Sequence, residues 1–225
     1  MTQIALLTGG SRGIGAATAN MLRARGWTVI APTRDVLDFA DTNSLSVYLL
    51  DWVRSIEVPQ FDAVIFCHGE WTSRSPWQSP GFDPAIVWYR QFTLRVFSPM
   101  FLLQFLLGGD PKWHPGCVVM VSSTRGLIGG VDTGPYAAAC AAQIALMQGY
   151  AREYGGRTRF NAVCPGLTDT DMGREVLTTG GAKPDAVPQP AEAVAAEIVR
   201  LIESGDNGRV MRVVDGAATE AKWSW

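Results

Sequence analysis

The sequence predicts one domain of the α/β class over residues 1–225, built as a doubly wound parallel sheet of about seven strands. Short apolar runs alternate with segments of helical periodicity along the whole chain. The first apolar run breaks into a glycine-rich turn that leads directly into such a helical segment. No internal repeat, low-complexity tract or linker interrupts this alternation, and 225 residues suit a single domain.

Composition excludes several classes of protein. Hydrophobic residues make up 47% of the chain and the net charge is −2, with no basic patch of the kind that nucleic-acid binders need. No segment is long enough to cross a membrane and no signal peptide is recognisable, which predicts a cytoplasmic protein without a membrane partner. The four cysteines lie far apart without metal-ligand spacing, so we expect neither a metal site nor a disulfide framework.

The first predicted strand, residues 4–7, runs into the turn T-G-G-S-R-G-I-G at Thr8–Gly15. A helix follows as far as Arg25 and Gly26, where a glycine suits a C-cap. Glycines permit the tight turn and let the backbone and the helix N-terminus approach a pyrophosphate. A strand, a glycine turn and a helix in this order predict a dinucleotide site.

The end of the second predicted strand, residues 27–31, indicates which dinucleotide binds. An acidic residue there would hold the adenosine ribose hydroxyls, whereas a basic residue accommodates a 2′-phosphate. Arg34 follows this strand, and Arg12 lies inside the glycine turn. Two guanidinium groups that can reach one phosphate favour NADP(H) over NAD(H), with Asp35 as the opposing signal.

The next part of the chain is predicted to hold two strands and a helix. A short strand covers residues 36–39, a helix runs from residue 42 or 44 to residue 55, and a fourth strand covers residues 61–67. Residues 70–84 then contain three prolines and two tryptophans, which is typical of a loop. Such a loop at a strand end indicates either a contribution to a substrate site or a packing lid without a role in specificity.

The remaining elements continue the alternation. A long apolar helix, residues 84–107, is expected to kink near Pro99, and a strand at 117–121 precedes a helix of small residues from 134 to about 153. The last elements are expected, in chain order, as a strand at 159–164, a polar glycine-rich loop at 168–188 that also shapes the substrate site, a helix at 191–203 and a seventh strand at 209–214.

Over essentially its whole length, the chain resembles the short-chain dehydrogenase/reductase family. The motifs that carry the resemblance are, in chain order, the turn at Thr8–Gly15, Gly69 at a strand end, Ser122-Ser123, Tyr136 thirteen residues after Ser123, Pro165-Gly166 followed by Thr170, and R-V-V-D-G-A near the end. The resemblance implies a Rossmann-like fold and NAD(P)-dependent hydride transfer on a small-molecule substrate.

The resemblance also implies roles for individual residues. Tyr136 matches the family's general acid/base, and Ser123 matches the residue that holds the substrate carbonyl. The glycine turn and the resemblance together assign dinucleotide binding to Gly9, Ser11, Arg12, Gly13, Ile14, Gly15, Arg34, Asp38, Gly69, Pro165, Gly166 and Thr170.

Two positions depart from the family pattern. The family places a lysine one helical turn after the tyrosine, and this chain has Cys140 there. The family's asparagine in the long helix corresponds to Arg95. A guanidinium near the tyrosine oxygen would lower the tyrosine pKa as the lysine does, so Arg95 is a third candidate catalytic residue. Cys140 is expected to be a buried thiol and His68 a hydrogen-bonded structural residue.

Three functions fit this pattern. The first is an NADP(H)-dependent oxidoreductase acting on a carbonyl or alcohol of a small, fairly apolar molecule. The second is a non-redox elimination, cyclisation or isomerisation that uses Ser123 and Tyr136, and the third is a non-catalytic partner subunit. The family resemblance further implies a homodimer or homotetramer formed through the helices at 84–107 and 134–153.

Overall fold

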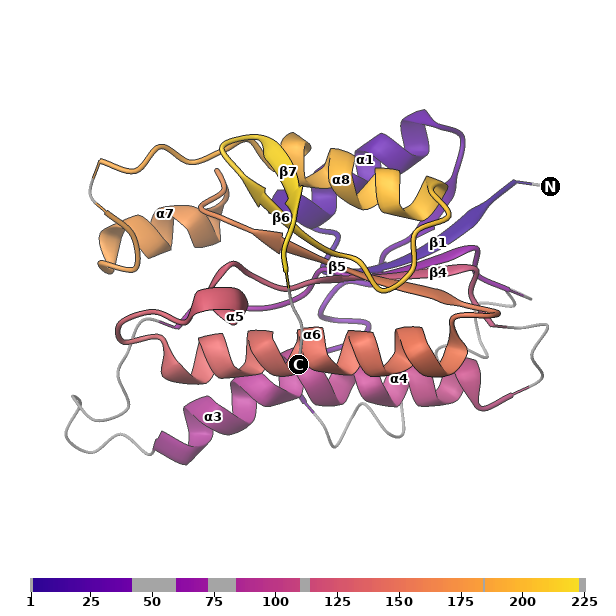
Figure 1. Cartoon of the computed structure of the whole chain (residues 1–225), viewed down its shortest axis with the longest axis horizontal. Coiled ribbons are helices and arrows are strands. Elements are labelled where there is room, and N and C mark those ends of the chain that lie inside the picture. Colours follow the sequence, from indigo (N-terminus) through magenta and orange to yellow (C-terminus); the bar gives the residue numbers. More distant parts are fainter. Residues whose placement is uncertain (1, 42–59, 73–83, 110–113, 184, 223–225) are drawn as a thin grey trace.

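The computed structural model describes residues 2–41, 60–72, 84–109, 114–183 and 185–222, which form a sheet covered by helices on both faces (Figure 1). The seven strands of the sheet follow the order β2-β1-β3-β4-β5-β6-β7. Their bounds are β1 Ile4–Thr8, β2 Thr28–Ile30, β3 Ala63–Phe66, β4 Cys117–Val121, β5 Arg159–Pro165, β6 Val210–Val214 and β7 Ala217–Glu220. All neighbouring strands are parallel except β6 and β7.

The helices lie in two layers, with α1 and α8 on one face of the sheet and α3, α4 and α6 on the other (Figure 1). The helices are α1 Gly13–Ala24, α3 Pro84–Phe92, the π-helical turn η1 Thr93–Phe97, α4 Ser98–Leu107, α5 Arg125–Ile128, α6 Gly134–Tyr154, α7 Asp171–Thr178 and α8 Ala191–Glu203. No helix among these is long and apolar enough to cross a membrane.

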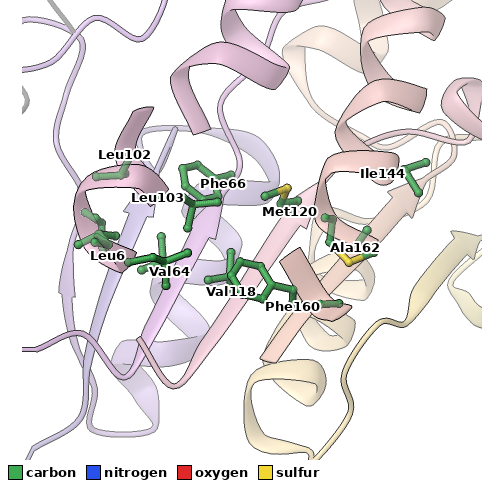
Figure 2. Packing of buried hydrophobic residues seen from close by; sticks show 14 of the residues in the cluster. Leu6, Val64, Phe66, Leu102, Leu103, Val118, Met120, Ile144, Phe160 and Ala162 are labelled. Atoms are coloured by element: carbon green, nitrogen blue, oxygen red, sulfur yellow. The ribbon is translucent and has the colours of Figure 1, made fainter. Parts of the chain in front are cut away.

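Alternation along the strands produces two cores, one on each face of the sheet. On the α4 and α6 face, Leu6 and Val64 lie near Leu102, and Ile144 belongs to the same apolar cluster (Figure 2). The next strand residues, such as Leu7, point to the opposite face and pack against α1 and α8. Strands buried on both faces read as continuous apolar runs, which is why these strands were recognisable in the sequence.

Several predicted elements are confirmed. The parallel α/β fold with seven strands is observed, β4 and α8 have the predicted bounds, and α6 extends the predicted helix by one residue. The predicted helix between residues 42 and 55 lies outside the described residues, as does most of the loop predicted at 70–84.

The strand predicted at residues 36–39 is wrong. A turn starts at Thr33, whose carbonyl accepts hydrogen bonds from the amides of Val36 and Leu37. Leu37 and Phe39 nevertheless bury their side chains in the core. The alternation of apolar residues therefore predicted correctly which side chains are buried. A side chain can be buried, however, without its backbone forming hydrogen bonds to a neighbouring strand. Within the described residues, β2 is consequently the outermost strand at this end of the sheet.

The segment predicted as a loop at 168–188 contains the helix α7, which is a second correction. Thr170 caps this helix by accepting a hydrogen bond from the amide of Gly173 at 3.0 Å. Two shorter elements, α5 and β7, were not predicted, and β7 is antiparallel. All three elements are eight residues or shorter, so hydrophobic periodicity had too few positions to mark them.

The long helix at 84–107 is interrupted earlier than Pro99. The π-helical turn η1 covers Thr93–Phe97 and continues directly into α4, which has Pro99 in its first turn. The irregularity is therefore centred on Arg95 rather than on the proline. Because π-turns are frequent at functional sites, this position makes Arg95 noteworthy before any chemistry is considered.

Candidate functional site

A cleft of about 1040 Å³ runs along the carboxyl ends of the parallel strands. The turns after β1, β3, β4 and β5 all open into it, because parallel strands place these ends at one edge of the sheet. Every candidate site residue from the sequence lines this cleft: Gly9, Ser11, Arg12, Gly13, Ile14, Gly15, Arg34, Asp38, Gly69, Arg95, Ser123, Tyr136, Pro165, Gly166 and Thr170.

The glycine turn between β1 and α1 packs backbone against backbone. Gly9 adopts φ +72°, and a Cβ there would lie 2.7 Å from the backbone of His68. A Cβ on Gly15 would collide with the carbonyl of Gly9. No side chain caps the N-terminus of α1, so its first amide groups have no side-chain acceptor. This cradle fits the pyrophosphate of a dinucleotide, which needs close backbone approach and unpaired N–H donors.

The two candidate phosphate-binding arginines lie along the same cleft. Arg12 is the N-cap residue of α1 and forms an exposed ion pair with Asp171 at 3.4 Å. Such an ion pair is worth little in water, so it does not compete strongly with a bound phosphate. Arg34 lies in the turn after β2. The cleft therefore carries positive charge where the sequence predicts a 2′-phosphate.

Two other predicted cofactor residues are engaged in local hydrogen bonds. Asp38 accepts a hydrogen bond from the amide of Ala40 at 2.9 Å. Thr170, the cap of α7, lies against the glycine turn, since a Cβ on Gly13 would approach its Cγ2 to 2.9 Å. Both residues line the cleft, so their assignment to cofactor binding stays a prediction that their positions permit.

Tyr136 lies in the first turn of α6, and its side chain is buried, with the residue 5% exposed. Burial raises its pKa to about 12, while the positive charge of Arg95 and a hydrogen bond with Ser123 both act to lower it. The tyrosine is therefore fully protonated at neutral pH. In this state it can donate a proton, and the nearby guanidinium stabilises the phenolate that donation leaves behind.

The guanidinium of Arg95 is a positive charge that acts on Tyr136. Its Cζ lies over the tyrosine ring, 4.6 Å from the ring centre, and Arg95 is 3% exposed. Gly69 makes room for it, because a Cβ there would lie 2.8 Å from Nη2. Among the described residues no carboxylate forms an ion pair with Arg95; its Nη1 donates to the carbonyl of Val121 at 3.5 Å and its Nε has no partner.

Cys140, in the position of the family's lysine, is completely buried. Burial raises the pKa of its thiol, so it does not form a thiolate nucleophile under ordinary conditions. The charge of Arg95 acts on this thiol and opposes the rise of its pKa. The guanidinium from η1 thus occupies the neighbourhood of residue 140 on α6, although the two residues are 45 positions apart in the chain.

His68 is a structural residue locked beside the site, as its position in the sequence predicted. Its Nδ1 lies 2.6 Å from the hydroxyl of Thr8, its Nε2 lies 2.9 Å from that of Ser98, and its ring stacks on Phe39. Both hydroxyls also lie within hydrogen-bond distance of a carbonyl, that of Ile65 for Thr8 and that of Leu94 for Ser98. Burial lowers the pKa of His68 to about 3, which keeps the ring neutral.

Two polar residues of this region were not identified from the sequence. Arg125 follows the serine pair, and its guanidinium donates to the carbonyls of Gly181 and Gly129 at 2.6 and 3.3 Å. Thr179, at the end of α7, accepts a hydrogen bond from the indole of Trp71 at 3.1 Å. No local pattern marks either residue, because each acts through a partner more than fifty residues away in the chain.

Comparisons with known proteins agree with this geometry. The sequence model described as short chain dehydrogenase matches residues 60–180. An A-factor type γ-butyrolactone 1′-reductase from Streptomyces virginiae is 28% identical over 226 residues, covering 87% of this chain and 85% of that protein. The uncharacterized oxidoreductase YmfI of Bacillus subtilis is 30% identical over 192 residues, covering 76% and 77%. A structure of ElxO with NADP bound has the same fold, with a TM-score of 0.76 at 20% identity over 94% of this chain and 97% of that chain.

Proposed function

Because the chain belongs to the short chain dehydrogenase family, we propose that it is an NADP(H)-dependent oxidoreductase. Its substrate is a carbonyl compound, or the corresponding alcohol, of a small and fairly apolar molecule. The observation that carries the proposal is the convergence of the glycine cradle, two arginines, Ser123 and Tyr136 on one cleft. The family relatives are named as oxidoreductases and reductases, in agreement with this class of reaction.

The cofactor half of the proposal rests on the β1–α1 turn. Gly9, Gly13 and Gly15 leave the backbone open to the pyrophosphate, and the uncapped start of α1 supplies N–H donors and the positive end of its dipole. Arg12 and Arg34 would hold the 2′-phosphate. The structural relative ElxO, solved with NADP bound, supports the same choice of cofactor.

The chemical half of the proposal rests on Tyr136, Ser123 and Arg95. Bound NADPH supplies the hydride that the substrate carbon accepts. Ser123 holds the substrate oxygen by a hydrogen bond, and Tyr136 donates its phenolic proton to that oxygen as negative charge develops. In the reverse direction the same phenolate accepts the proton of the alcohol.

Arg95 takes over the electrostatic role that the resemblance assigns to the missing lysine. Its charge lies over the Tyr136 ring and lowers the tyrosine pKa, against the larger effect of burial. A lysine at position 140 would bring a second cation near this guanidinium, because the charge of Arg95 acts on the Cys140 thiol. Arg95, in place of the family's asparagine, and Cys140, in place of its lysine, therefore compensate each other. The positive charge beside Tyr136 is kept, but it comes from η1 instead of α6.

The proposal includes a homodimer or homotetramer formed through the helical layer of α3, α4 and α6. In this layer, α3 exposes Ile86 and Tyr89, which are 60% and 57% exposed. Large apolar side chains in such positions favour contact with another copy. The small residues along α6 allow close helix approach.

Calorimetric titration with NADPH, NADP⁺, NADH and NAD⁺ tests the cofactor assignment. We expect the phosphorylated pair to bind at least about tenfold more tightly, because a bidentate arginine–phosphate contact contributes on the order of 1.5–3 kcal/mol. Arg34→Ala should remove most of this preference. The control is Arg23→Ala, which changes an exposed arginine of α1 that does not line the cleft.

Turnover is measured in the same preparation as loss of NADPH absorbance on addition of cyclohexanone, a small apolar ketone. Equal affinity for all four nucleotides, or an Arg34→Ala variant with unchanged preference, would contradict the 2′-phosphate assignment. No binding of any nucleotide would contradict the oxidoreductase itself and leave a cofactor-free catalyst or a partner subunit.

A further inference from the structure

The indole ring of Trp71 covers Tyr136. The two ring centres lie 5.0 Å apart with an angle of 71° between the planes, and Trp71 is 7% exposed. Together with Cys140 they form a small apolar cluster, separate from the two main cores, against which Met172 and Val176 of α7 pack. A substrate that places its carbonyl oxygen at the Tyr136 hydroxyl must therefore lie against Trp71 and this face of α7.

The Trp71 ring is anchored at its polar end. Its Nε1 donates to the hydroxyl of Thr179 at 3.1 Å, and that hydroxyl in turn donates to the carbonyl of Glu175 at 2.7 Å. The six-membered ring of the indole, at Cζ2 and Cη2, lies so close to Gly181 that a Cβ there would collide with it. One hydrogen bond and one tight backbone contact thus hold the ring over the tyrosine.

The segment that holds Trp71 is itself tied to the other side of the site. Arg125 donates from Nη2 to the carbonyl of Gly181 at 2.6 Å, and its backbone amide donates to the Ser123 hydroxyl at 3.2 Å. A continuous series of contacts therefore runs from Ser123 through Arg125 and Gly181 to Trp71 and back to Tyr136. The space beside the two catalytic hydroxyls is closed on this side by a built wall.

From this arrangement we propose that Trp71 is a specificity-determining residue whose anchored ring limits the site to small carbonyl compounds. The inference rests on the proposed oxidoreductase function and adds the size limit of its substrate. An unbranched or single-ring ketone fits beside the indole, whereas a fused bicyclic ketone needs the volume that the ring occupies. Because a packed wall deforms little, each excluded methylene costs about 1–3 kcal/mol in the transition state.

A pair of ketones that differ in size tests this limit. We compare kcat/KM for trans-1-decalone with kcat/KM for cyclohexanone, using NADPH, and express the result as a ratio. Trp71→Ala should raise the ratio at least about tenfold, because the ring no longer fills the space beside Tyr136. Trp71→Phe keeps a ring there and should change the ratio by less than about threefold.

Two neighbouring threonines provide a matched pair that does not disturb the core. Thr178 and Thr179 are both exposed, and both hydroxyls donate to the carbonyl of Glu175, but only Thr179 accepts from Trp71. Thr179→Val should raise the ratio at least about threefold by releasing the ring, because one hydrogen bond contributes about 1 kcal/mol. Thr178→Val should leave it unchanged. A ratio that stays within twofold of wild type in folded Trp71→Ala, or in Thr179→Val should the alanine variant not fold, overturns the proposal.

A second readout does not depend on turnover. Cys140 belongs to the cluster that Trp71 closes and is completely buried, so its reaction with a thiol reagent, followed by peptide mass spectrometry, reports opening of the wall. We expect labelling of Cys140 to accelerate at least about tenfold in Trp71→Ala, and less in Thr179→Val. If the wild-type protein reduces neither ketone, the proposed function fails, and the labelling rates alone decide this inference: unchanged rates in both variants overturn it.

Discussion

The most unusual residue of this protein is Arg95, a buried cation without a carboxylate partner among the described residues. Burying a charge costs free energy unless nearby groups compensate for it. Here the guanidinium lies over the Tyr136 ring face and donates to the carbonyl of Val121. A protein keeps such a residue when function needs the charge at that place, which is beside the proposed proton donor.

Replacing Arg95 tests this argument. Arg95→Met keeps similar volume but removes the charge, so the Tyr136 pKa should rise further and turnover should fall about 10- to 1000-fold, as expected for losing an opposite charge within 4–6 Å. The affinity for NADPH should stay within about threefold. In the direction of alcohol oxidation, the increase of rate with pH should move to higher pH, because oxidation requires the phenolate.

Arg95→Lys is the matched variant for this experiment, since it retains the charge on a shorter side chain. It should recover part of the lost turnover. Wild-type turnover in folded Arg95→Met would remove Arg95 from the mechanism, and equal loss in both variants would assign the effect to packing rather than to charge.

A second residue-scale prediction concerns His68. Its pKa is lowered from 6.5 to about 3, first because it is buried, so the folded protein keeps it neutral while the unfolded chain protonates it below pH 6.5. Its contribution to stability is therefore fully present above pH 6.5 and is lost as the pH falls toward 3. Between pH 7.5 and 4.5 this amounts to about 3 kcal/mol of unfolding free energy.

Urea unfolding of wild type and His68→Gln at both pH values measures this term. Glutamine cannot titrate, so the variant should lose about 3 kcal/mol less than wild type on acidification, although it is less stable at pH 7.5. The same pH dependence in both proteins would show that His68 is not the responsible group.

At the scale of elements, the unit formed by β1, the glycine turn and α1 is a tightly constrained part of the site. The Cα of Gly15 lies so close to the carbonyl of Gly9 that no Cβ fits between them. The turn therefore has one backbone path, and this path presents the N–H groups of α1 to the cleft. Its sequence is restricted by packing as well as by ligand binding.

Two Gly→Ala substitutions separate this packing effect from the general effect of glycine in a helix. Gly15→Ala should lower the unfolding free energy by about 2–3 kcal/mol through overpacking and should abolish NADPH binding. Gly149→Ala, in α6, meets no atom within 4 Å and should raise stability by about 0.5–1 kcal/mol. Urea unfolding and calorimetric titration of both variants provide the measurement. Unchanged nucleotide affinity in Gly15→Ala would contradict the role of the turn.

The interruption of the long helix is a second functional feature at this scale. In η1 the backbone departs from regular α-helical hydrogen bonding over Thr93–Phe97, and the first three of these residues are buried. The irregular turn places the Arg95 guanidinium against Gly69 and over Tyr136. The arginine at position 95, where the family has asparagine, and the irregular geometry of η1 therefore both contribute to placing this charge.

At the scale of the whole molecule, the parallel sheet assembles the site. Four strand ends, those of β1, β3, β4 and β5, contribute residues to one cleft, while α6 and α7 provide its far walls. The two apolar cores beneath the site come from the same strands. The rigidity that packing gives to these strands is what holds Ser123, Tyr136 and Arg95 in register.

Much of this architecture could be predicted from the sequence. Strands buried on both faces, such as β4, appear as apolar runs, and α8 has a clear helical periodicity, so their bounds were predicted correctly. The glycine turn and the spacing from Ser123 to Tyr136 were informative for the same reason: each is a local pattern with a local geometric cause. The fold class and the residues lining the cleft follow from such patterns and from the rule that parallel strands end at one edge.

Only the tertiary structure decided the contacts between distant segments. It alone placed the guanidinium of Arg95 beside Cys140, anchored Trp71 on Thr179, and joined Arg125 to Gly181. It also decided that Leu37 and Phe39 are buried without forming a strand and that α7 is a helix. Periodicity and spacing report what a segment does with its own neighbours, whereas charge compensation and ring packing depend on which side chains meet across the fold.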